Sequence, residues 1–90
     1  MQAQRNPRAI DQLEVRGAGD EVLVHDVLNG KIHVLNSTAG RVLLLCDGSR
    51  PIEMIVSELA QGTGVAQETI AIDVAELLAQ FARIGLLSDS

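Results

Sequence analysis

Apolar and polar residues alternate in three short runs along the first third of the chain. The runs read QLEVR, EVLVHD and KIHVL, at residues 12–16, 21–26 and 31–35. Alternation with a period of two predicts strands, and GAGD supplies a turn between the first two. The second connection contains Asn29-Gly30, which predicts either a two-residue hairpin turn or a longer loop that ends with Gly30 in the left-handed conformation. We expect a three-stranded antiparallel meander whose buried side chains include Val22, Val24, Ile32 and Val34.

The period changes to that of a helix after the third run. Apolar residues recur at helical spacing over about 37–46, 51–61 and 67–84, which predicts three helices. The first helix follows three candidate N-cap residues, Asn36, Ser37 and Thr38, and Pro51 suits the first turn of the second. Three strands followed by three helices predict an α+β fold, a winged helix-turn-helix with an N-terminal three-stranded antiparallel sheet.

The length of the chain fits one small domain, which we place at residues 11–90. Residues 1–10 are polar, contain Pro7 and show no periodicity, so we expect a flexible tail there. The sequence has no apolar segment typical of a signal peptide or a membrane span, and its single cysteine, Cys46, fits a reducing compartment. We therefore expect a cytoplasmic protein.

The charge and the aromatic content exclude several classes of partner. The net charge of −5 disfavours nucleic acid and anionic membranes, because both require a concentrated positive surface. Phe81 is the single aromatic residue, so no aromatic platform is available for stacking bases. In a DNA-binding winged helix the third helix would enter the groove, yet here its charges are mostly acidic: Glu68, Asp73, Glu76 and Arg83. We expect neither nucleic acid nor a membrane as a partner.

Few residues offer catalytic or metal-binding chemistry. Cys46 with a histidine is the one nucleophile and base set, but Cys46 lies at a core position, where free cysteine usually acts as a small hydrophobe. His25 and His33 would be cross-strand neighbours in some registers, yet two imidazoles without a third ligand make a poor metal site. We interpret them as solvent-exposed strand residues. Since no phosphate-binding, dinucleotide-binding or serine-nucleophile motif occurs, we expect no enzymatic activity, no metal and no cofactor.

The third predicted strand must lie at an edge, because the strands of a meander follow sequence order. Edges that are not used for pairing usually carry proline, several charges or a covering segment, whereas KIHVLN carries only Lys31. Such an edge allows an extended peptide to add as a further strand. The alternative is that residues 1–10 or a second copy of the chain cover it. Leu44, Met54 and Ile72 lie off the core faces of their helices, which together suggests a partner.

The segments VLNGKIHVLNSTAGRVLLLCDGSRPIEMIVSEL and IAIDVAELLAQFARIGLL resemble the PqqD family. This family is named after coenzyme PQQ synthesis protein D and is the prototype of the RiPP recognition element, where RiPP denotes a ribosomally made, modified peptide. The resemblance spans about residues 12–87. It rests on the ordered spacing of these positions: Leu35-Asn36, Thr38-Ala39, Val42-Leu43, Leu45-Cys46-Asp47-Gly48, Arg50, Ile55-Val56, Leu59, Asp73-Val74, Leu78, Phe81 and Gly85-Leu86-Leu87.

The resemblance implies a non-enzymatic peptide chaperone that binds the leader of a precursor peptide and presents it to a modifying enzyme, such as a radical SAM enzyme. It implies that the leader lies antiparallel to the third strand, in a groove walled by the third helix. The peptide-binding residues are then Lys31, Ile32, His33, Val34, Leu35, Asp73, Glu76, Leu77, Gln80 and Arg83. Leu44 stands where many relatives carry a polar residue, which implies a contact with the enzyme. The alternative hypothesis is a winged-helix interaction or dimerisation module without peptide cargo.

Overall fold

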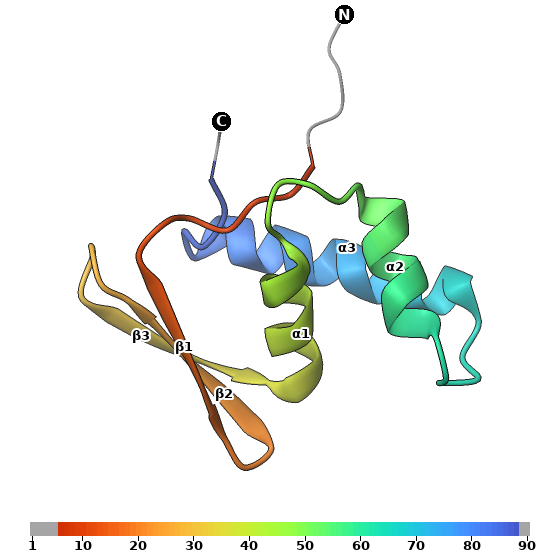
Figure 1. Ribbon diagram of the computed structural model, residues 1–90, viewed down its shortest axis with the longest axis horizontal. Coiled ribbons are helices and arrows are strands. Elements are labelled where there is room, and N and C mark those ends of the chain that lie inside the picture. Colours follow the sequence, from red (N-terminus) through yellow and green to blue (C-terminus); the bar gives the residue numbers. More distant parts are fainter. Residues whose placement is uncertain (1–5, 89–90) are drawn as a thin grey trace, which may run out of the picture.

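The computed structural model describes residues 6–88 and contains three strands followed by three helices (Figure 1). The elements are β1 (Leu13–Ala18), β2 (Glu21–Asp26), β3 (Lys31–Asn36), α1 (Ser37–Leu45), α2 (Ile52–Ala60) and α3 (Gln67–Arg83). The strands form one antiparallel sheet in the order β1-β2-β3. The predicted α+β fold with an N-terminal sheet is confirmed. No helix among the described residues is long and apolar enough to cross a membrane.

The loop between β2 and β3 is organised by the buried side chain of Asp26. Its carboxylate accepts hydrogen bonds from the backbone N–H of Asn29 at 3.1 Å and from the Asn29 side-chain amide at 2.8 Å. The Gly30 N–H donates to the Asp26 carbonyl at 2.8 Å, and Gly30 adopts a φ of 68°, which favours glycine. The loop is therefore the longer of the two predicted forms, and it pairs Asp26 with Lys31.

The prediction that Ile32 and Val34 are buried is wrong. Their exposed fractions are 66% and 57%, whereas Leu35 is buried. The register explains the difference, because Val24, which is fully buried, pairs with His33, and paired residues of antiparallel strands point to the same face. His33 and Leu35 therefore face the helices, and Ile32 and Val34 lie on the opposite face of the sheet, here called the outer face.

Helix α1 packs on the inner face of the sheet, and α2 and α3 pack against α1 and against each other to enclose one apolar core. Asn36 caps α1, because its side-chain oxygen accepts the N–H of Ala39 at 2.8 Å. Gly40 lies so close to β2 that a Cβ atom there would be 2.6 Å from Cγ2 of Val22. The buried apolar residues are Val24, Leu35, Ala39, Val42, Leu43, Cys46, Ile55, Val56, Leu59, Val74, Leu78, Phe81 and Leu86.

Residues 6–10 are bonded to the helical part of the domain. The Ala9 N–H donates to the Cys46 carbonyl at 2.8 Å, and the Ile10 N–H donates to the Leu86 carbonyl at 2.9 Å. Figure 1 shows this segment (red) running beside the α1–α2 connection and the C-terminal segment. A tail over 1–10 was predicted from the sequence, and residues 6–10 depart from that prediction; residues 1–5 lie outside the described residues.

Replacing Gly40 tests the close approach of α1 to the sheet. Overpacking of this kind costs about 1–3 kcal/mol, more than the roughly 0.5–1 kcal/mol that alanine contributes over glycine inside a helix. We expect Gly40→Ala to lower the free energy of unfolding by about 1 kcal/mol in urea denaturation. The same substitution made together with Val22→Ala should cost less than the sum of the two single changes, because the clash is removed. Strictly additive losses would contradict the packing described.

The carboxyl of Asp26 gives stability a dependence on pH. Its pKa lies below the ordinary value of 3.8, chiefly because the Asn29 side chain donates a hydrogen bond to the carboxylate. A carboxyl whose pKa is lowered by folding stabilises the fold above its unfolded pKa, and this contribution is lost as the pH falls through the folded pKa. We expect Asp26→Asn to lower the urea midpoint at neutral pH and to flatten its decline below about pH 4. Asp20→Asn, at an exposed turn position, is the control and should leave the profile parallel to that of the unmodified protein.

Candidate functional site

The edge of β3 that points away from β2 pairs with no other strand in the part of the chain that the structure describes. The sheet order places β3 at an edge, and the bridges formed outside the named strands join Arg8 with Asp47 and Ala9 with Leu87. Neither bridge involves β3, so residues 6–10 do not cover it. An edge strand presents unpaired N–H and C=O groups. The backbone of Lys31–Leu35, which was predicted as the peptide-binding strand, is therefore open to pairing.

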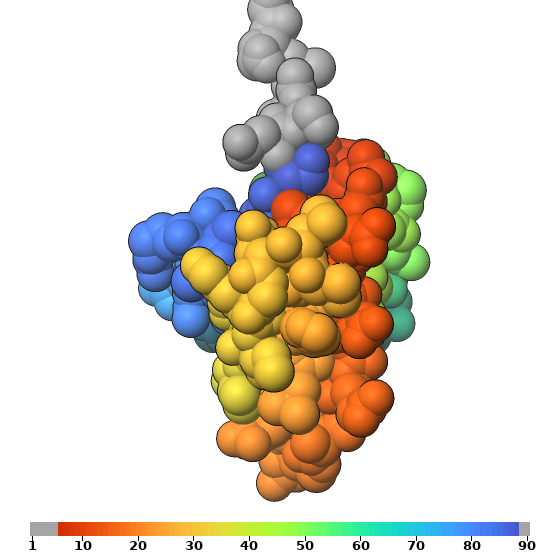
Figure 2. All heavy atoms as spheres, turned by 90° about the vertical axis from the view of Figure 1, so that its left-hand side faces the viewer, coloured from red at the N-terminus to blue at the C-terminus, as the bar shows by residue number. Residues whose placement is uncertain are grey.

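Helix α3 lies beside this edge without packing on it. Figure 2 shows the C-terminal half of α3 (blue) on one side of β3 (yellow) and β1 (red) on the other. No Cα atom of β3 lies within 8 Å of a Cα atom of α3. A hollow of about 360 Å³ lies between the end of β3 and α3, and its lining residues are Asn36, Thr38, Asp73, Glu76, Leu77 and Gln80.

Four of the five predicted residues on α3 line this hollow together. Asp73, Glu76, Leu77 and Gln80 follow helical spacing, so they share one face of α3. Arg83, the fifth, is exposed one turn beyond them and does not line the hollow. A more enclosed hollow adjoins the first and shares part of its lining, and it is mostly apolar: Thr38, Arg41, Leu59, Thr63, Val65, Ile70, Asp73, Val74 and Leu77.

The five predicted residues of β3 differ in what they offer. Lys31, Ile32 and Val34 have exposed side chains, whereas the Leu35 side chain belongs to the core and leaves its backbone for pairing. His33 faces the helices, and its Nε2 atom is buried without a hydrogen-bond partner. Such an atom is costly to leave unpaired, so it favours a donor or acceptor from a ligand or a water molecule.

Asn36 and Thr38 line the hollow but were not among the predicted binding residues. Both were identified in the sequence as candidate N-caps, and Asn36 does cap α1. The sequence does not show their place in the site, because the junction of β3 and α1 reaches the hollow only through the way α1 and α3 pack together. Their position between strand and helix was the available signal.

The groove, meaning the space between β3 and α3 that includes the hollow of about 360 Å³, carries two carboxylates that form no ion pair among the described residues, although Arg41 lines the adjoining hollow together with Asp73. The ion pairs formed by residues 6–88 join Arg8 with Asp11, His25 with Glu14, and Arg50 with Asp47 and Glu58. None of them includes Asp73 or Glu76, which are both exposed. The wall on α3 therefore favours a ligand with basic or hydrogen-bond-donating side chains on the inner side.

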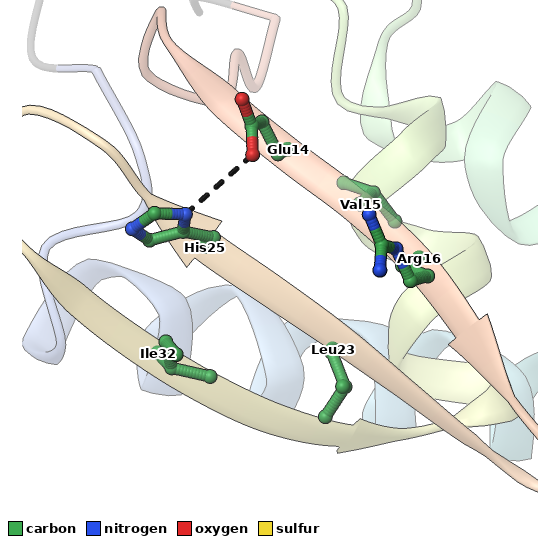
Figure 3. Close-up of a pocket in the computed structure, with 6 residues that line it drawn as sticks. All are labelled: Glu14, Val15, Arg16, Leu23, His25 and Ile32. Carbon is green, nitrogen blue, oxygen red and sulfur yellow. Dashed lines mark ion pairs between the residues drawn. The ribbon is translucent and has the colours of Figure 1, made fainter.

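The remaining candidate groups lie apart from the groove. His25 lies on the outer face, with its Nδ1 atom 3.5 Å from Oε1 of Glu14 (Figure 3). It pairs with Ile32, whereas His33 pairs with Val24, so the two histidines point to opposite faces of the sheet and are not cross-strand neighbours. Among the residues described, no three of His, Cys, Asp or Glu gather as a metal site would require. Burial raises the pKa of the Cys46 thiol to about 11, and its Sγ donates to the Val42 carbonyl at 3.1 Å. Leu44, predicted to contact an enzyme, is 62% exposed on α1.

Comparison with known proteins finds a family model that matches this chain and solved structures that are similar to it. A family model described as coenzyme PQQ synthesis protein D (PqqD) matches residues 11–87. The structure of TbiB1 in complex with the TbiA(beta) leader peptide is similar, with a TM-score of 0.77, 22% identity, and coverage of 92% of this chain and 96% of that one. So is lasso peptide synthetase B1 complexed with the leader peptide, with a TM-score of 0.76, 17% identity, and coverage of 92% and 98%. None of the curated proteins matches the chain. Because the family model spans most of the sequence, this chain belongs to the PqqD family.

Proposed function

We propose that this protein binds the leader of a ribosomally synthesised precursor peptide by strand addition to β3. The observation that carries the proposal is the uncovered edge of β3 beside the hollow lined by α3, in a chain of the PqqD family. The two similar structures are both complexes with a leader peptide, which supports the same kind of ligand here. Main-chain hydrogen bonds to β3 supply affinity that is independent of side chains.

The guest strand lies antiparallel to β3, with the side chains of one of its faces directed at α3. On that side it meets Asp73, Glu76 and Gln80 on the helix. Leu77 supplies an apolar contact within the lining of the hollow, and Arg83 extends the wall by one turn. An inward-facing side chain with a basic or amide group fits this lining best.

The protein itself performs no chemistry in this proposal, and it presents the bound precursor to a modifying enzyme, such as a radical SAM enzyme. The buried Cys46 thiol stays protonated at neutral pH, since its pKa is raised to about 11. Leu44 projects from α1 outside the groove, so it is available to the enzyme while the leader occupies β3. Because the precursor is made on ribosomes, the encounter takes place in the cytoplasm.

Amide NMR of the labelled protein tests the proposal, with synthetic leader segments from short open reading frames beside its gene as probes. In an edge strand alternate N–H groups point away from the sheet. We expect alternate amides among Lys31–Asn36 to exchange rapidly in the free protein and to become protected when the probe binds. Chemical shifts should change along α3 as well. Changes confined to α1 and α2 would contradict strand addition to β3.

A dimerisation module without peptide cargo is the second candidate, because the same free edge would pair with a second copy of the chain. Light scattering over a range of concentrations distinguishes the two. If the mass is that of a dimer and dilution releases the β3 amides, this second candidate is favoured. A monomeric mass at all concentrations favours the peptide.

A further inference from the structure

The outer face of the sheet differs sharply between its two edges. On β1 the outward positions are Glu14 and Arg16, followed by the small Ala18. On β3 the outward positions include Ile32 and Val34, which are among the most exposed large apolar side chains of the described residues. Charges protect an unused edge, and β1 has them. The outer face of β3 has none, although an exposed apolar edge strand is an aggregation hazard.

Leu23 on β2 extends this exposed apolar surface from the β3 edge toward the middle of the sheet. It pairs directly with Val34, and it lines with Ile32 a hollow on the outer face (Figure 3). The other side of this hollow is mostly polar, because Glu14 and Arg16 line it together with Val15 on β1 and His25 on β2. In Figure 3 the helices lie behind the strands, so none of the three described helices covers this face. The apolar strip formed by Leu23, Ile32 and Val34, here called the outer strip, thus runs up to the free edge and ends there.

We infer that the outer strip is the second half of the peptide site, and that it reads aliphatic or β-branched side chains on the outward face of the guest strand. The inference rests on the proposed function. A strand added to β3 places its outward side chains directly beside Ile32 and Val34, at the distance of a cross-strand pair. Apolar guest residues two positions apart would then cover both of them and extend the outer strip across the former edge.

The two faces of the guest therefore meet opposite chemistry. Its inward residues face the acidic wall of Asp73 and Glu76, and its outward residues face the outer strip. The preferred ligand is an extended segment that alternates basic or amide side chains with aliphatic ones. A peptide with the same composition but shifted by one residue places every side chain on the wrong face, so the outer strip also sets the register.

The probe for this inference is a displayed library of random peptides long enough to span the six residues of β3 with a margin at both ends. We expect the unmodified protein to enrich sequences with aliphatic or β-branched residues two positions apart and polar, mainly basic, residues between them. For an enriched peptide, Ile32→Thr combined with Val34→Thr should raise Kd about tenfold, since threonine keeps strand propensity but removes apolar contact.

The matched control is Ile72→Thr, which makes the same change at an isoleucine 60% exposed on α3, outside the groove lining. It should change Kd by less than about twofold. Circular dichroism and urea midpoints establish that each variant is folded, and Ile32→Thr alone serves if the double variant is not. Its expected loss is about threefold.

Each outcome decides the inference. If peptides are enriched without the alternation, or bind the double variant as tightly while the β3 amides still respond, the inference fails and the proposed function stands. If no peptide is enriched and leader segments leave the β3 amides unchanged, both fail. If the unmodified protein is a dimer that the double variant converts to a monomer, the outer strip serves self-association and the inference is overturned.

Discussion

The direct passage of β3 into α1 is the constraint on which the rest of the structure depends. Asn36 is the last residue of the strand and also the cap of the helix, so no linker separates the two. Gly40 then allows α1 to settle onto Val22 at a distance that a larger residue would prevent. These two contacts fix α1 on the inner face at the end of β3. Helix α3 packs against α1 and α2 and does not reach β3, so α1 acts as the spacer that holds the groove open.

The termini of the described chain secure the opposite side of the same helices. Residues 6–10 bond to Cys46 and Leu86, and Asp47 is held by Ser49 and Arg50. The main-chain bonds that these segments form therefore tie the ends of α1 and α3 together without using the sheet edge. A domain of this size buries only a modest core. The hydrogen bonds of the terminal segments add stability at the helical end, and they leave the edge of β3 open.

The order and bounds of the elements could be predicted because each rests on local signals: period-two alternation, N-caps, glycines and Pro51. Which face of β3 is buried could not, because KIHVLN has apolar residues on both faces, and period alone does not distinguish Ile32 and Val34 from Leu35. The register is set by the Asp26 loop and by the junction with α1, which are three-dimensional constraints. Similarly, residues 6–10 are held by backbone hydrogen bonds that leave no side-chain pattern to detect.

The candidate site was predictable in part for the same reason. Helical spacing identifies Asp73, Glu76, Leu77 and Gln80 as one face, and strand order identifies the edge. Neither signal shows that Asn36 and Thr38 line one end of the hollow, because their position depends on how α1 turns away from β3. The family resemblance suggests a peptide as the ligand, and the structure shows which residues line the hollow beside the free edge.

The error at Ile32 and Val34 is informative about function. A sequence that folds well agrees with its structure at every level, and disagreements concentrate where a position serves something other than folding. Burying Ile32 and Val34 inside the isolated domain would require the opposite register, which would expose Leu35 and break the junction with α1. The chain instead leaves two large apolar side chains in solvent at an unprotected edge, a cost in solubility that folding alone does not repay. A strand from another molecule would satisfy the edge and cover these side chains together, so one guest accounts for both departures from the pattern.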